Sequence, residues 1–96
     1  MMSSRQRAKL RAFANEMETI LHVGKGGVTQ NLIRQADEAL TARELIKGRV
    51  LESAGISARE AAVGIADATG SEPVQVIGMR FVLYRENKQN KKIFLD

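Results

Sequence analysis

The 96-residue chain has no cysteine and no tryptophan, and it has one proline and one histidine. Without cysteine there are no disulfides, no thiolate metal sites and no cysteine nucleophile. A single histidine is too few for the ligand sets of zinc sites. We therefore expect no metal, no cofactor and no catalytic residue.

Long apolar runs are also missing. No stretch approaches the ~20 apolar residues that span a bilayer, and the first residues lack the apolar run of a secretory signal. These absences predict a cytoplasmic protein without a membrane segment. Residues 1–15 contain arginine and serine but no acid, which also fits a transit peptide. We favour a helix there, because removing its apolar stripe would cost a small domain much of its core.

Aromatic residues make up 4% of the chain and hydrophobic residues 44%. The core must therefore be aliphatic and rich in alanine. The length suffices for a single domain over residues 1–96, for which we expect a monomer.

Charge is distributed in blocks along the chain. Residues 1–49 carry nine basic and five acidic side chains, residues 50–77 carry one and four, and residues 78–96 carry five and two. This pattern predicts a basic and an acidic face, and a basic face indicates a phosphate-bearing partner. Ordinary solvated lysines and arginines would give the same composition.

Three stretches carry helical signals. Residues 4–15 follow a serine cap and place one apolar stripe on Leu10, Phe13, Ala14 and Met17. Thr29 opens a second helix, and a third, residues 58–69, begins with the capping box Ser57-Ala58-Arg59-Glu60.

Four stretches are typical of strands, namely residues 19–23, 45–51, 74–77 and 80–85. Gly78-Met79 separates the last two and predicts a type II′ hairpin. Pairing Ile77 with Arg80 sets Val76 against Phe81 and Val74 against Leu83 on one face, and leaves the opposite face to Val82 and Tyr84.

In residues 45–51, alternation places Ile46 and Val50 on one face and Lys47 and Arg49 on the other. Gly48 within this strand predicts either a bulge or a close approach of backbone. The order α-β-α-β-α-β-β predicts an α/β sandwich with a four-stranded mixed sheet. Right-handed crossovers place its second and third helices on one face, provided that the strands flanking each helix are parallel neighbours. We expect residues 87–92 to fray.

The most informative stretch is the loop Gly24-Lys25-Gly26-Gly27, between a strand and a helix. Glycines let the backbone approach a ligand, and the amides at a helix start attract phosphate. Neither the dinucleotide-binding fingerprint nor the P-loop sequence fits these residues. A G-x-x-G loop with a basic residue inside it is typical of the KH modules that clamp a nucleic-acid backbone. A short glycine loop is also found as an ordinary turn.

Three blocks in order resemble the signature of YhbY-type CRM domains, for chloroplast RNA splicing and ribosome maturation. They are Val23-Gly24-Lys25-Gly26-Gly27-Val28-Thr29, Glu44-Leu45-Ile46-Lys47, and Val74-Gln75-Val76-Ile77-Gly78 leading into Val82-Leu83-Tyr84-Arg85. The resemblance covers about residues 5–95. It implies an α/β RNA-binding module similar to the C-terminal domain of a bacterial translation initiation factor. The single-domain prokaryotic form is associated with precursors of the large ribosomal subunit.

The resemblance implies a non-enzymatic protein that binds ribosomal RNA and large-subunit precursor particles and assists their assembly. We expect the backbone of Gly24, Gly26 and Gly27 to clamp phosphates, with Lys25 adding charge. A further positive surface is expected from Arg5, Lys9, Lys47 and Arg49, and the third helix would face away from the RNA. Two alternatives are a protein-docking module that uses an open sheet face at Val82 and Tyr84, and a small phosphate-ligand enzyme, for which no general base with a partner is evident.

Overall fold

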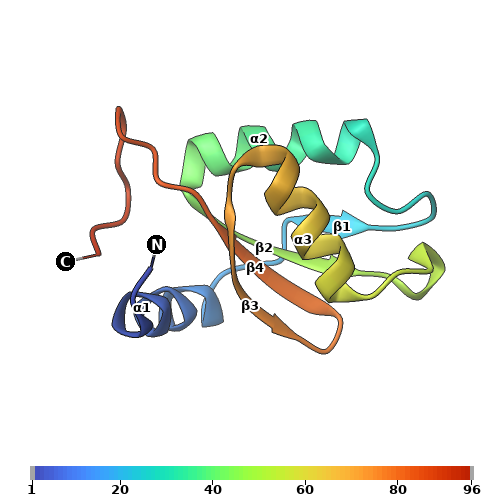
Figure 1. Ribbon diagram of the computed structural model, residues 1–96, viewed down its shortest axis with the longest axis horizontal. Coiled ribbons are helices and arrows are strands. Elements are labelled where there is room, and N and C mark those ends of the chain that lie inside the picture. Colours follow the sequence, from blue (N-terminus) through green and yellow to red (C-terminus); the bar gives the residue numbers. More distant parts are fainter. Residues whose placement is uncertain (1, 96) are drawn as a thin grey trace.

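The computed structural model describes residues 2–95, which form three α-helices, a short 3-10 helix and a four-stranded sheet (Figure 1). In chain order these are α1 (Ser4–Asn15), β1 (Leu21–Val23), α2 (Gln30–Arg43), β2 (Leu45–Val50), η1 (Glu52–Ala54), α3 (Ala58–Thr69), β3 (Glu72–Ile77) and β4 (Arg80–Tyr84). The predicted α-β-α-β-α-β-β order is confirmed. β1 is two residues shorter than predicted. Within the described residues, no helix has the length and apolar character needed to cross a membrane.

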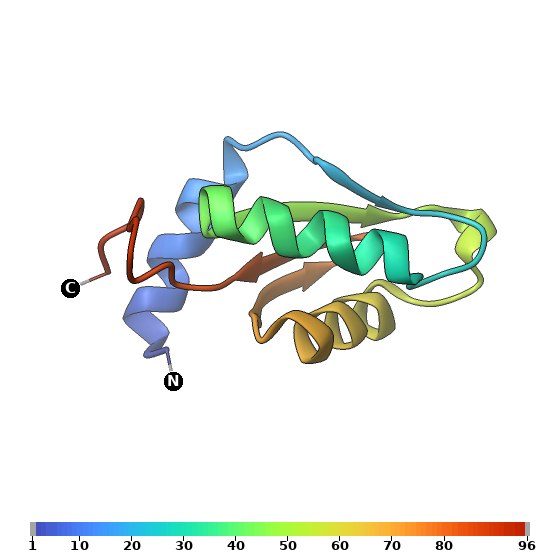
Figure 2. The same ribbon diagram turned by 90° about the horizontal axis from the view of Figure 1, so that it is seen from above.

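The sheet is mixed, as predicted, with the strand order β1-β2-β4-β3. β1 pairs with β2 in parallel, whereas β4 is antiparallel to both β2 and β3. Helices α2 and α3 cover one face, and α1 lies across one end of the opposite face (Figures 1 and 2). The prediction that the second and third helices share a face is therefore confirmed.

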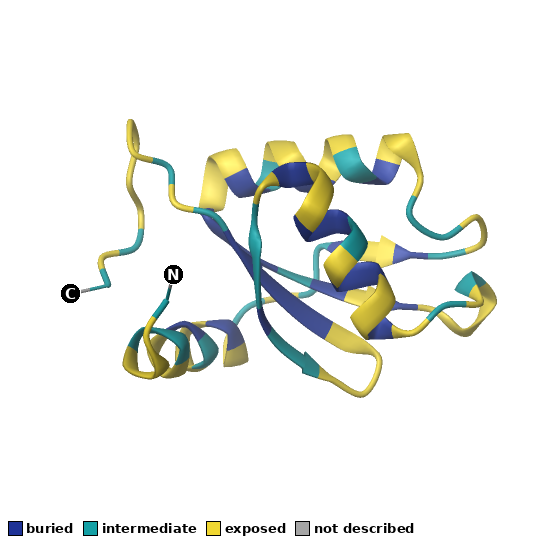
Figure 3. Cartoon of the chain, viewed as in Figure 1, coloured by how far each residue is buried: buried dark blue, intermediate teal, exposed yellow. Residues whose placement is uncertain are grey.

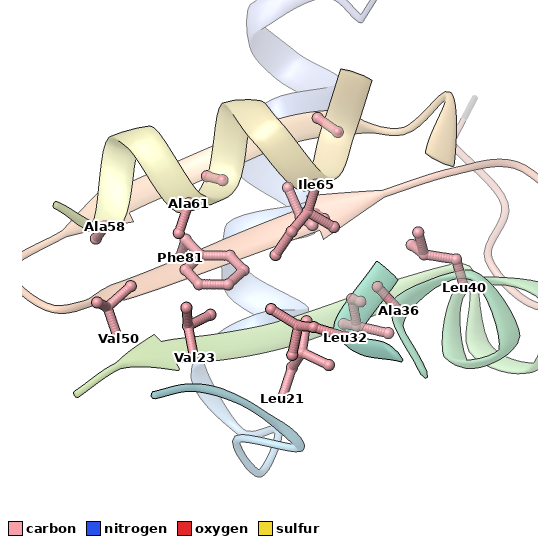
Figure 4. Close-up of a cluster of buried hydrophobic side chains, with 14 residues drawn as sticks. Leu21, Val23, Leu32, Ala36, Leu40, Val50, Ala58, Ala61, Ile65 and Phe81 are labelled. Atoms are coloured by element: carbon pink, nitrogen blue, oxygen red, sulfur yellow. The ribbon is translucent and has the colours of Figure 1, made fainter. Parts of the chain in front are cut away.

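The main core fills the space between the sheet and helices α2 and α3. The ring of Phe81 lies among aliphatic side chains from both helices and from β1 and β2 (Figure 4). Gly48 pairs with Phe81 across the sheet, and a Cβ at Gly48 would lie 2.3 Å from Cζ of this ring. The β2–β4 register is unshifted at Gly48, so the predicted bulge is not found there, and the missing side chain leaves the space that the Phe81 ring occupies.

A second apolar cluster lies on the other face, beneath α1. Its buried members are Leu10, Ala14, Leu45, Val74, Val82 and Tyr84, and Figure 3 shows the burial along the middle of the sheet. Val82 is 3% and Tyr84 9% exposed, so the prediction of an open sheet face at these residues is wrong. The alternative of a protein-docking module that uses this face is therefore rejected. Burial raises the pKa of the Tyr84 hydroxyl, and the nearby Glu44 raises it further.

Phe13, predicted on the apolar stripe of α1, is 48% exposed, so the stripe is narrower than predicted.

The β3–β4 hairpin follows the predicted register from its tip as far as Gln75, and the predicted pairing of Val76 with Phe81 is confirmed. Gly78 has φ of +57°, as the first central residue of a type II′ turn requires, and Ile77 pairs with Arg80. The predicted pairing of Val74 with Leu83 is wrong. The register shifts between Pro73 and Gln75, and Pro73 pairs with Leu83 instead.

This bulge has a physical basis in the edge strand β3. Pro73 has no N–H to donate to a ladder, and bulges are common at such sites. Nη1 of Arg7 on α1 donates to the carbonyl oxygens of Pro73 at 2.8 Å and Val74 at 3.1 Å. Because of the bulge, the Val74 side chain points to the α1 side of the sheet and belongs to the cluster beneath α1.

The segment after β4 is held in place, where fraying was predicted for residues 87–92. Glu44, which is fully buried and has φ of +67°, directs its carboxylate at this segment. Its Oε2 accepts a hydrogen bond from the Asn87 amide at 2.7 Å, and its Oε1 accepts bonds from the Lys92 and Ile93 amides at 2.6 Å each. The Lys91 ammonium, which hydrogen-bonds Glu86, lowers the pKa of that carboxyl.

Candidate nucleic-acid interface

The glycine loop of residues 24–27 connects β1 to α2 at the end of the molecule remote from α1 (Figures 1 and 2). The Gly27 amide donates to the Gly24 carbonyl at 3.0 Å and closes a turn. Gly26 and Gly27 have φ of +100° and +68°, a region that side chains disfavour. Gly24 lies outside this region, and a Cβ there would make ordinary contact at 3.6 Å with Cδ1 of Leu51. The fold thus requires glycine at positions 26 and 27 but tolerates alanine at 24.

The start of α2 adjoins this loop. Oγ1 of Thr29 caps the helix by accepting from the Leu32 amide at 3.1 Å, while the first-turn amides of Gln30 and Asn31 have no acceptor within the helix. The first turn of α2 contains no acidic residue, whereas α3 carries Glu60 in its capping box. The positive end of the α2 dipole is therefore not neutralised from within the helix, and it favours an anion.

Loop and helix start together form a shallow hollow of about 170 Å³. Lys25 lies on its rim and is exposed. The other lining residues supply mostly polar side chains and backbone: His22, Gly24, Gly27, Thr29, Asn31, Leu32 and Gln35. Among the described residues, none of those lining the hollow is a carboxylate. The hollow therefore offers hydrogen-bond donors and positive charge to a phosphate-sized anion.

The structure does not bring all the predicted cations to this loop. Arg5 and Lys9 lie on α1, at the opposite end of the molecule (Figures 1 and 2). Lys47 donates from Nζ to the Ala14 carbonyl at 3.1 Å, so it binds the last turn of α1. Arg49 is exposed, and it pairs with His22 of β1, which lines the hollow. Of these four cations, Arg49 is the one nearest the loop along the sheet.

Sequence reasoning missed several residues of this region. The polar side chains of Asn31 and Gln35 line the hollow, but on a helix such residues are indistinguishable from ordinary solvated positions. Arg80 pairs with Arg49 across β4 and β2. Strand alternation alone could place Arg80 on a face, but its neighbour depends on β4 lying beside β2, which the local sequence does not specify.

Comparisons with known proteins agree with this architecture. A family model for the CRS1/YhbY (CRM) domain matches residues 2–85. The Bacillus subtilis protein named "Probable RNA-binding protein YqeI" is 43% identical over 95 residues, covering 99% of each chain. A Haemophilus influenzae protein named "RNA-binding protein" is 28% identical over 90 residues, covering 94% of this chain and 91% of its own.

A solved structure is also similar. The solution structure of the hypothetical protein SAV1595 from Staphylococcus aureus superposes with a TM-score of 0.78 at 41% identity, and the match covers 100% of both chains. The predicted fold is therefore confirmed by a relative as well as by the element order. Because the family model spans nearly the whole of the chain, this protein belongs to the CRS1/YhbY (CRM) domain family.

Proposed function

We propose that this protein binds RNA through the glycine loop and the start of α2, without catalysing a reaction. The observation that carries the proposal is the meeting of a positive-φ glycine turn with an acid-free helix start, with Lys25 on the rim. Phosphate is the anion that such amides and dipoles favour. The names of the relatives, which describe RNA-binding proteins, support RNA as the source of that phosphate.

The chemistry of the hollow favours the RNA backbone over the bases. Among the described residues that line it there is no Phe, Tyr or Trp, and His22 supplies a single imidazole ring, whereas base recognition in single strands depends largely on stacking platforms of several rings. Phosphate contacts position a protein on RNA but carry no sequence information. We therefore propose that the loop recognises RNA by the course of its backbone.

We further propose that the RNA is ribosomal and that the protein assists assembly of the large ribosomal subunit in the cytoplasm. Membership of the CRM family supports this role, since the single-domain form of the family is associated with large-subunit precursors. The test is crosslinking of the protein to RNA in cells, followed by sedimentation of the ribosomal particles. Enrichment of large-subunit precursor RNA is expected, and crosslinks spread evenly over cellular RNA would contradict the assembly role.

Replacing Lys25 by alanine is expected to weaken binding to poly(U) and poly(A) oligonucleotides by a similar factor, because a phosphate contact does not distinguish bases. The slope of log K against log salt should become shallower by about 0.7, the contribution of one phosphate on a single strand. Fluorescence anisotropy titrations at several salt concentrations measure both quantities. Loss of affinity for one sequence alone would mean that the site reads bases.

Replacing Gly24 by alanine is expected to leave the protein folded and to lower its RNA affinity tenfold or more, about 1.4 kcal/mol. The added methyl has ordinary space within the fold, 3.6 Å from Leu51, but it would keep an RNA phosphate from the loop backbone. Thermal unfolding and anisotropy are measured on the same sample.

The matched control is Gly64→Ala on α3, where a Cβ would lie 3.7 Å from Cγ2 of Val28. This variant adds the same methyl at an ordinary contact distance and should bind RNA like the parent. If Gly24→Ala also folds and binds like the parent, the loop acts only as a turn.

A further inference from the structure

Helix α1 covers only one end of its face of the sheet, and the remainder of that face is uncovered and basic. Where α1 packs, Leu45 and Tyr84 are buried. Toward the glycine loop, three exposed side chains follow one another on adjacent strands. We call them the basic row: His22 of β1, Arg49 of β2 and Arg80 of β4.

The register makes the row a straight line across the sheet. His22 pairs with Arg49 in the parallel ladder, and Arg49 pairs with Arg80 in the antiparallel one. Paired residues direct their side chains to the same face. With neighbouring strands about 4.8 Å apart, the three side chains are spaced over roughly 10 Å.

Nothing within the described residues 2–95 compensates this charge through direct contact. The ion pairs found there join Arg7 to Glu72, Arg85 to Asp37 and Lys91 to Glu86. The side chains of the basic row make no hydrogen bond or ion pair in this part of the chain. Like charges directly opposite on neighbouring strands destabilise a sheet, so the Arg49–Arg80 pair has a cost without a folding benefit.

We infer that the basic row is a second phosphate-contact surface, over which the RNA backbone crosses β1, β2 and β4 after leaving the glycine loop. This inference rests on the proposed function. The two surfaces are continuous, because His22 belongs to the row and also lines the hollow with Gly24 and Lys25. Two residues of extended chain, about 7 Å, separate His22 from Gly24.

The row contacts phosphates and not stacked bases. The three phenylalanines and one tyrosine of the chain lie elsewhere: Phe81 and Tyr84 are buried, Phe13 is on α1, and Phe94 is in the C-terminal segment with the Lys91 ammonium over its ring. Apart from the single imidazole of His22, the described part of the uncovered face thus lacks the Phe and Tyr platform on which sheet-based RNA modules stack two or three bases. Its arginines supply charge and forked donors suited to phosphate oxygens.

The test replaces both arginines of the row by glutamine and compares this variant with a charge-matched control. The control, Arg43→Gln with Lys88→Gln, removes two exposed cations from the end of α2 and the C-terminal segment, far from the loop (Figure 1). Binding is measured on poly(U) and poly(A) oligonucleotides of one length.

For the Arg49→Gln, Arg80→Gln variant we expect affinity to fall at least tenfold on both oligonucleotides. The salt slope should become shallower by about 1.4, from about 0.7 per phosphate contact. The unfolding temperature should stay equal to that of the parent or rise. Equal losses in the row variant and the control would overturn the inference, because total charge alone would then explain them. A loss confined to one oligonucleotide would overturn it in favour of base recognition.

A second readout uses His22, the one histidine of the chain. Its ring C–H signals are unambiguous in an NMR spectrum, and they should shift when poly(U) is added to the parent and shift less with the row variant. Unchanged ring signals in the parent at saturating RNA would overturn the inference. If Gly24→Ala loses binding while the Arg49→Gln, Arg80→Gln variant binds like the parent, the inference that the basic row contacts phosphate is overturned, and the proposed function of the loop is kept. If no variant differs because the parent itself does not bind RNA, the proposed function fails as well.

Discussion

Replacing Gly48 by alanine is expected to destabilise the protein by about 3 kcal/mol, at the upper end of the cost of overpacking a core. The new Cβ would lie 2.3 Å from Cζ of Phe81 and within 2.6 Å and 2.9 Å of two further ring carbons. The ring cannot easily move aside, because it is 1% exposed and packed among side chains from α2, α3 and the sheet (Figure 4). Urea unfolding of the parent and the variant measures the difference.

The clash with Phe81 can be tested separately from any general effect of alanine in a strand. Phe81→Leu removes the clashing ring atoms and carries its own cost from lost burial. If the ring causes the destabilisation, the Gly48→Ala, Phe81→Leu double variant should lose less free energy of unfolding than the two single variants together. Additive losses would show that Gly48 is required for another reason.

The elements that local signals define were predictable from the sequence. The capping box at Ser57 and Glu60 predicted the start of α3, and both of its hydrogen bonds are present. The turn at Gly78 fixed the pairing of Ile77 with Arg80, which is confirmed. In each case the residues that decide the structure lie within a few positions of one another.

Features that depend on distant partners were not predictable in this way. The register extended from the Ile77–Arg80 pair placed Val74 opposite Leu83, but a bulge beside Pro73 moved Val74 to the other face. There Arg7 donates to the carbonyls of both residues. Glu44 follows a helix and gives no sign in the sequence of being buried. The backbone amides that donate to its carboxylate lie 43 to 49 residues away along the chain.

The candidate site also combines a part set by local sequence with a part set by distant partners. The glycine loop is one contiguous stretch, so the local sequence alone predicted a phosphate site there. The hollow between the loop and the start of α2 is consistent with that prediction. The accompanying cations depend on topology. Lys9 and Arg49 belong to one basic block of the sequence, yet they lie at opposite ends of the molecule (Figure 1), while Arg80 reaches Arg49 through the β2–β4 pairing.

Replacing Glu44 by glutamine is expected to lower the free energy of unfolding by about 2 to 4 kcal/mol. Three backbone amides converge on the carboxylate at 2.6 to 2.7 Å, and each bond to a charged acceptor contributes about 1.5 to 3 kcal/mol. Glutamine keeps the shape and the backbone conformation but replaces one oxygen with an NH₂ group. At least one of the three amides would then face a donor in a buried position.

Hydrogen exchange distinguishes this local cause from a general loss of stability. In the parent, the amides of Asn87, Lys92 and Ile93 should exchange slowly, because opening them breaks bonds to a buried acceptor. In Glu44→Gln they should exchange much faster than the amides of β2 and β4. The matched control is Glu38→Gln on the exposed side of α2, where the same chemical change should alter stability by less than about 0.5 kcal/mol. Slow exchange at these three amides in Glu44→Gln, with parental stability, would mean that the carboxylate does not hold the C-terminal segment.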